Sequence, residues 1–276
     1  MISSWNSIVN ADVGVVFPIL LLVGMYGLHD PTFLITYGYG LSISAYGVVL
    51  ISLTAPLLKT SFTLNIALVL IQSCLLALYG LRLNVFMFRR KYNPTYKEKM
   101  EIHVRLPVAV CMWIMTQMLY FCYGLPVFIG YRSLLSPYRF NPITHGIGVV
   151  VMILGLGCEA QADREKTLMK AIHPSRHCDA GLYRYCRMPN YFGEMTFWTG
   201  CFVSFLGDSF SLFQLLFAGY GFVCMCAVML GAARRLDRKQ YERYHADPDY
   251  MKYRSTVPVL FPFFPLYSMI SNKKNE

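Results

Sequence analysis

Charged residues are scarce in this sequence. Asp, Glu, Lys and Arg make up 14% of the 276 residues, whereas hydrophobic residues make up 55%. A soluble globular domain carries about 25% charged residues, and a disordered chain has low hydrophobicity. The composition therefore excludes a disordered chain, and it does not fit a water-soluble dinucleotide-binding enzyme or a protein that binds nucleic acid. The expected fold class is all-α, a polytopic membrane protein that forms a single transmembrane domain over residues 1–276.

Cysteine pairs with the CxxC spacing are also missing. The nine cysteines include no CxxC pair, so neither a disulfide framework nor a zinc site is indicated. His173, His177 and Cys178 form an H-x-x-x-H-C group, but Pro174 disfavours the helix that would bring both histidines to one face. We expect no metal site.

Long apolar stretches divide the chain into spans. A membrane-crossing helix needs about 20 apolar residues. We expect seven transmembrane helices, at about residues 13–28, 33–57, 62–88, 106–130, 143–158, 191–206 and 210–231. Between residues 257 and 267 three prolines interrupt an aromatic stretch, which excludes another spanning helix and fits a position at the membrane interface.

Basic residues predict the orientation of these spans. The net charge is +10, and most Lys and Arg residues fall in three segments, 89–105, 164–187 and 234–274. The positive-inside rule places these segments and the C-terminus in the cytosol, beside the anionic headgroups of the bilayer. Lys273 and Lys274 have the spacing of a dilysine retrieval signal, which indicates the endoplasmic reticulum.

Polar residues gather between positions 155 and 194, where a cytosolic membrane mouth is expected. Carboxylates near hydrocarbon are costly unless they are paired or bind a ligand. Pro189 precedes Asn190, which we expect to be the N-cap of the sixth span, and Glu194 lies one turn deeper. Arg184 and Arg187 beside this helix N-terminus favour an anion-binding site.

Three stretches resemble one family. The string GLYRYCRMPNYFGE at residues 181–194 resembles the steroid 5-alpha-reductase family, in particular a poorly characterised branch of it. The acidic stretch 159–163, the pattern at 79–84 and the C-terminal segment 241–263 are similar to the same family. The resemblance implies a seven-span reductase that uses NADPH to reduce a C=C bond of a lipid, with residues 155–265 as the cofactor-binding part.

The resemblance also assigns residues. It implies catalytic roles for Asp179, as proton donor, and for Tyr191. It implies cofactor contacts for Asp163, Lys170, Arg184, Arg187, Asn190, Tyr191, Glu194 and Tyr241. The phosphates of NADPH need cations, and arginine suits phosphate, so Arg234 and Arg235 join this set.

Some residues depart from the family pattern, and the sequence leaves alternative roles for others. Met188 replaces the usual His of the motif, and the second span has no acidic residue, so a simple 3-keto-steroid activity is not indicated. Arg82 lies inside the third span, where it either serves the substrate or forms a structural ion pair with Glu159. Sterol, polyprenol and enoyl-lipid substrates all remain open, as does the oligomeric state.

Two other functions compete with the reductase. The R-x-P-x-Y-x-G element also occurs in isoprenylcysteine carboxyl methyltransferases, which use S-adenosylmethionine, but these usually carry two adjacent glutamates where this chain has Arg234 and Arg235. A catalytically inactive lipid-binding scaffold is the third hypothesis, and Met188 is the residue that favours it.

Overall fold

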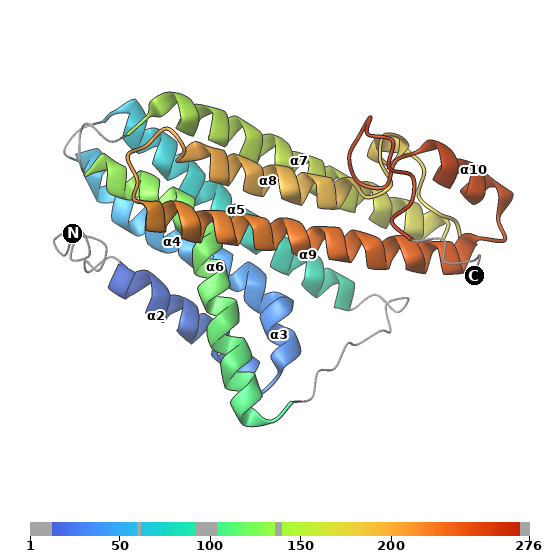
Figure 1. Ribbon diagram of the computed structural model, residues 1–276, viewed down its shortest axis with the longest axis horizontal. Coiled ribbons are helices and arrows are strands. Elements are labelled where there is room, and N and C mark those ends of the chain that lie inside the picture. The colour runs from blue at the N-terminus through green and yellow to red at the C-terminus, as the bar shows by residue number, and fades with distance from the viewer. Residues whose placement is uncertain (1–12, 60–61, 92–103, 136–139, 271–276) are drawn as a thin grey trace. The chain divides into compact units, whose positions relative to one another are not determined.

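The computed structural model describes residues 13–59, 62–91, 104–135 and 140–270, and all regular structure in these ranges is helical. The long helices are α4 (Tyr37–Thr54), α5 (Leu64–Lys91), α6 (Leu106–Leu134), α7 (Pro142–Ile172), α8 (Pro189–Ser204) and α9 (Leu212–Tyr244). Shorter helices are α2 (Val13–Gly24), η1 (Met25–Leu28), α3 (Pro31–Ile35), η2 (Ala55–Lys59), η3 (Gly181–Arg184) and α10 (Pro248–Thr256). Figure 1 shows these helices in chain order.

Five helices are long and apolar enough to cross a membrane. They cover Tyr37–Lys59, Leu64–Arg89, Leu106–Leu134, Pro142–Ile172 and Leu212–Tyr244. The chain is therefore a multi-pass membrane protein. The predicted count of seven is not confirmed, because the first predicted span is the shorter apolar helix Gly14–Leu28 and the sixth is α8, with 16 residues.

The helix bounds correct several details of the sequence prediction. The predicted span 33–57 is divided at Thr36, whose backbone (φ −114°, ψ −102°) separates α3 from α4. Asn190 is not an N-cap, because α8 already begins at Pro189, which suits a first helical position. No helix crosses residues 257–267, as the prolines predicted. Lys273 and Lys274 lie outside the described residues.

The chain forms two compact units. The N-terminal unit contains Met1–Val149 and Cys201–Gly221, and the C-terminal unit contains Val150–Gly200 and Phe222–Glu276. Helices α7, α8 and α9 each contribute residues to both units.

Small residues hold the N-terminal unit together. A Cβ atom on Gly80 would lie 2.2 Å from the carbonyl oxygen of Gly40, and one on Gly47 would lie 2.4 Å from the amide nitrogen of Ala77. Helices α4 and α5 are thus in backbone contact, as is common where membrane helices pack through glycine. Gly40 is therefore a packing glycine.

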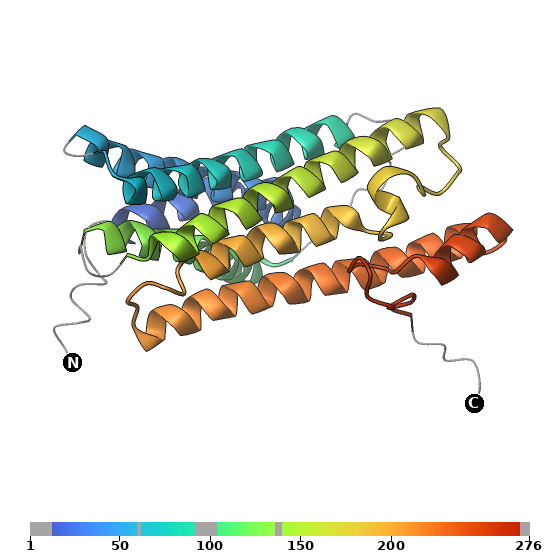
Figure 2. The ribbon, with the colours of Figure 1, turned by 90° about the horizontal axis from the view of Figure 1, so that it is seen from above.

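The C-terminal unit is built from α7, α8, α9 and the irregular tail after α10. A Cβ atom on Gly155 of α7 would lie 2.3 Å from the amide nitrogen of Phe197 on α8. Met188, Ala233, Val259 and Leu260 form a fully buried core that joins the start of α8 to α9 and the tail. Figure 2 shows the N-terminal part of α8 beside the later part of α9.

Candidate functional site

Three buried carboxylates lie on the two helices of the C-terminal unit that carry the family-like motif. Glu159 and Asp163 on α7 are 3% and 8% exposed, and Glu194 on α8 is 7% exposed. A Cβ atom on Gly193 would lie 2.6 Å from the amide nitrogen of Glu159, so the two helices touch where Glu159 and Glu194 sit. Carboxylates in such a place are expensive to bury and mark a functional site by default.

The segment before α8 is fixed to α7 through Glu165. The Glu165 carboxylate accepts a hydrogen bond from the amide of Leu182 at 2.8 Å. Gly181 has a φ of +61°, and a Cβ atom there would lie 2.3 Å from Cδ of Glu165. Only glycine fits this position without strain, so the glycine of the motif sets the path of the chain toward α8.

Arg187 is buried and holds several segments of the C-terminal unit together. Its side chain is fully buried, and Nη1 donates to Asp237 Oδ1 at 2.8 Å. Nη2 donates to the carbonyl of Tyr267 at 2.8 Å and Nε to that of Val257 at 3.3 Å. The guanidinium therefore joins the motif to α9 and to both ends of the tail. A cofactor contact by Arg187 stays a prediction, and its donors already have partners inside the chain.

Lys170 is engaged in a similar way. Its Nζ donates to the carbonyls of Pro174 and Arg176 and, at 2.7 Å, to the hydroxyl of Tyr244. The ammonium also lies 5.2 Å from the centre of the Tyr244 ring. Lys170 thus stabilises the turn that follows Ile172, the last residue of α7.

Other cations are available for a ligand. Arg184, Arg234 and Arg235 are exposed, and among the described residues none of them has a hydrogen-bond or ion-pair partner. Arg184 borders a small cleft of about 230 Å³ together with Tyr185, Pro258, Thr256, Phe263, Phe264 and Tyr267. Arg234 and Arg235 follow the buried Ala233 on α9. Free guanidinium groups on one unit are suited to phosphate.

Asn190 supplies an unsatisfied acceptor in the first turn of α8. Its Oδ1 atom is buried and has no hydrogen-bond partner in the described chain. A buried amide oxygen without a donor costs free energy, so this atom is a candidate for a ligand contact. Tyr191, the next residue, is partly buried and packs against the core that contains Met188 and Val259.

Two of the remaining predicted residues lie near the end of α9 and in the loop before η3, and a third lies on α5. Asp179 accepts from Arg176 at 3.0 Å, and its carboxylate is 29% exposed. Tyr241 is 38% exposed and stacks under Arg254, whose guanidinium carbon is 4.8 Å from the ring centre. Arg82 lies half-buried on α5, in the N-terminal unit. Its predicted partnership with Glu159 stays a prediction.

Burial changes the acidity of three groups near the motif. Burial raises the pKa of the Tyr183 hydroxyl, which donates to the carbonyl of Ala162. Burial also raises the pKa of the Tyr253 hydroxyl, which donates to the carbonyl of Tyr183 at 2.7 Å. It raises the pKa of the Cys186 thiol to about 12. All three groups are held neutral and serve packing rather than acid–base chemistry.

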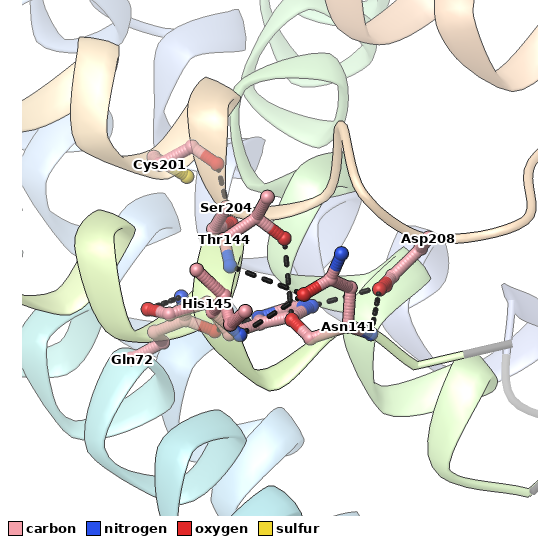
Figure 3. Close-up of polar contacts among 8 residues, drawn as sticks. Gln72, Asn141, Thr144, His145, Cys201, Ser204 and Asp208 are labelled. Carbon is pink, nitrogen blue, oxygen red and sulfur yellow. Dashed lines mark hydrogen bonds and ion pairs between the residues drawn. The ribbon is translucent and has the colours of Figure 1, made fainter.

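A second polar cluster lies in the N-terminal unit, and the sequence analysis missed it. His145 of α7 contacts Gln72 of α5 through Nδ1 at 2.9 Å and Asp208 through Nε2 at 3.0 Å (Figure 3). The side chains of His145 and Asp208 are 0% exposed. Two features of the sequence could have indicated this cluster: a histidine in an apolar predicted span, and an aspartate in the short connection between two predicted spans.

The long apolar helices and the buried charges define the chain as a helical multi-pass membrane protein. The profile of the DUF1295 family, described as a protein of unknown function, matches residues 42–257, so the chain belongs to this family. The family is associated with steroid 5-alpha-reductase-like proteins. No curated protein and no solved structure matches the chain.

Proposed function

We propose that the protein is an integral-membrane oxidoreductase that reduces a C=C bond of a lipid with NADPH. The family-like motif at residues 181–194 carries this proposal, because it contains an unsatisfied buried amide oxygen on Asn190 and belongs to the unit that also has the exposed residues Arg184, Arg234 and Arg235. Sterols, polyprenols and enoyl lipids are the substrate classes that an apolar membrane site would take.

The residues of the C-terminal unit fit such a cofactor in two respects. Arg184, Arg234 and Arg235 have guanidinium groups without a partner in the described part of the chain, which suits the phosphates, whereas Arg187 and Lys170 position the surrounding chain. The Asn190 Oδ1 atom can accept from a carboxamide N–H of a nicotinamide. NADPH would supply a hydride to one carbon of the C=C bond, while Asp179, the proton donor that the resemblance implies, would give a proton to the other carbon.

Carboxylates of the C-terminal unit orient these groups. Glu165 fixes the motif to α7 through Leu182, and Asp237 fixes Arg187. Asp163 and Glu194 are 8% and 7% exposed and lie in the same unit, and the resemblance implies a cofactor contact for each of them. The protein thus contributes orientation and electrostatics, and the cofactor contributes the redox chemistry.

We also propose that the C-terminus is cytosolic and that the protein resides in the endoplasmic reticulum. The basic segments and the Lys273-Lys274 pair support this orientation and location. A glycosylation acceptor placed after the last residue is expected to stay unmodified, whereas one placed before the first span is expected to be glycosylated.

The direct test is transfer of deuterium from NADPH deuterated at the reactive nicotinamide carbon to a lipid extract. The purified protein in detergent is expected to yield a saturated lipid with one deuterium. Replacing both Arg234 and Arg235 by Ala is expected to weaken NADPH binding by about tenfold or more, because the double substitution removes at least one charge-assisted hydrogen bond to the cofactor. Arg243→Ala on the same helix is the matched control, because Arg243 donates to Pro174. Methyl transfer from S-adenosylmethionine without NADPH binding would contradict the proposal.

A further inference from the structure

The cleft beside Arg184 is too small for a whole ligand. Its volume is about 230 Å³, whereas a pocket that encloses a small molecule measures roughly 300–1,000 Å³. Among the described residues that border the cleft, Arg184 is the sole charged one. The cleft therefore suits one anionic group of a larger molecule, and the remainder of that molecule lies outside the cleft.

Exposed aromatic side chains surround this cleft. Phe263, Phe264 and Tyr185 all border it, and they are 89%, 58% and 56% exposed. The rings of Tyr185 and Phe263 contact each other, with a centroid distance of 6.4 Å and an interplanar angle of 57°. Exposed apolar groups that gather in one place indicate a surface that another molecule or a membrane covers.

The backbone of the tail holds Phe263 outward. The amide of Val259 donates to the carbonyl of Leu266 at 2.8 Å, and the amide of Leu266 donates to the carbonyl of Phe264 at 2.7 Å. Phe263, within this closed loop, has a φ of +65°, which is strained for an aromatic residue. The strain and the exposed ring both cost free energy, and contact of the ring with an apolar environment would offset part of that cost.

The attachment of the tail to α9 places the cleft at the level of the lipid headgroups. Arg187 joins the carbonyl of Tyr267, which borders the cleft, to Asp237 on α9. The apolar stretch of this helix ends near residue 231, and Asp237 lies six residues later, about 9 Å further along the helix. The headgroup layer on each side of a bilayer is roughly 5–8 Å thick.

We propose that the cleft binds the headgroup phosphate of an anionic phospholipid. The Arg184 guanidinium donates two parallel N–H groups to oxygens of the phosphate. Phe263, Phe264 and Tyr185 lie against the upper part of the acyl chains, in the interfacial layer that aromatic residues prefer. A basic pocket on the predicted cytosolic side of a membrane protein is suited to anionic headgroups.

A cofactor phosphate is the other occupant with the same chemistry. Arg234 and Arg235 suit phosphate as well as Arg184 does, but they do not border the cleft. A phospholipid is favoured here, because its chains offer apolar surface to three exposed rings at once. The proposal goes beyond the reduction of a lipid and does not depend on it. It assigns Arg184 to the membrane and leaves Arg234 and Arg235 to the cofactor.

Native mass spectrometry of the full chain in detergent tests the proposal. We would titrate phosphatidylserine against diacylglycerol with the same acyl chains, which has no phosphate. We expect phosphatidylserine to bind more tightly, and Arg184→Gln to weaken its binding by about tenfold or more, because a charge-assisted hydrogen bond is lost. Arg238→Gln is the matched control, since Arg238 is exposed on α9 and does not border the cleft, and it is expected to keep the wild-type affinity.

A competition experiment distinguishes the lipid from the cofactor. NADPH added to the complex with phosphatidylserine is expected to leave the lipid bound. Displacement of the lipid by NADPH would overturn the proposal and return Arg184 to the cofactor site. Equal affinity of Arg184→Gln and the wild type for phosphatidylserine would also overturn it, as would equal affinity of the wild type for diacylglycerol. A failure of NADPH to bind at all would contradict the proposed function but not the lipid site.

A measurement in a bilayer covers the case in which Arg184→Gln does not fold. Phe263→Trp adds a fluorescent ring at the exposed tip of the tail, and the wild type, with its three tryptophans, supplies the baseline. In nanodiscs with phosphatidylserine, bromine atoms near the carbonyl end of the acyl chains are expected to quench the added emission. Added emission that stays unquenched would overturn the proposal, because the rings around the cleft would then lie in water.

Discussion

Removal of the Arg187 guanidinium is expected to destabilise the protein before it affects any ligand. Arg187→Met keeps an unbranched apolar stem but leaves the carboxylate of Asp237, which is 0% exposed, without its closest cation. The substitution also leaves the carbonyls of Val257 and Tyr267 without their donors. The tail should then detach from α9.

The size of the effect follows from the burial of the pair. Removing one partner of a buried ion pair costs about 3–5 kcal/mol, because the other charge stays buried and uncompensated. At roughly 2–4 °C per kcal/mol, this corresponds to a melting temperature lower by about 6–20 °C. The double substitution Arg187→Met with Asp237→Leu is expected to cost less than the sum of the two single ones, because it removes both charges.

The assay is thermal unfolding in detergent, combined with limited proteolysis at Arg254 in the tail-proximal helix α10. Arg184→Met is the matched control, since Arg184 is exposed and lies in the same motif, and it is expected to change stability by less than about 0.5 kcal/mol. Wild-type melting of Arg187→Met together with a loss of NADPH binding would refute the structural role and return Arg187 to the cofactor site.

Three further predictions concern the motif and its surroundings. Gly181→Ala should lower the free energy of unfolding by about 1–2 kcal/mol or more, because φ is +61° at this position. Gly157→Ala is the control and should not lower the free energy of unfolding, because a Cβ atom there has nothing within 4 Å; chemical unfolding measures both variants. Burial raises the pKa of Tyr253, so the folded state keeps a proton that the unfolded chain releases near pH 10, and the stability present below that pH is lost as pH rises further; Tyr253→Phe should show a shallower alkaline loss of melting temperature than the wild type. The Cys186 thiol, with a pKa of about 12, should resist maleimide at pH 8 until the protein is denatured, as mass spectrometry can show.

Hydropathy located the apolar core of each long helix but not its end. The predicted fifth span stops at residue 158, where the sequence becomes polar, yet α7 continues to Ile172, because Pro174 is the first residue that breaks a helix. The predicted seventh span stops at residue 231, whereas α9 continues to Tyr244, shortly before Pro248. Helices end near residues that interrupt the backbone hydrogen bonds, such as proline, whereas hydropathy indicates only the part of a helix that lies in the bilayer.

The site was predictable where its members are close in sequence. Motif spacing selected Asn190 and Glu194 on α8, and the structure places a buried acceptor and a buried carboxylate there. The partner of Arg187 was not predictable, because Asp237 lies 50 residues away. The pairing of His145 with Asp208, across 63 residues, required the tertiary structure in the same way.

Ligand-dependent stabilisation of the purified protein tests the central claim most directly. NADPH, NADH and S-adenosylmethionine would be compared by thermal unfolding in detergent, since a ligand that binds only the folded state adds about 2.7 kcal/mol of stability at a concentration of 100 times its Kd. The reductase proposal predicts a concentration-dependent rise in melting temperature with NADPH that is lost when Arg234 and Arg235 are replaced by Ala. A rise with S-adenosylmethionine alone, or no rise with any of the three ligands in a folded sample, would contradict it.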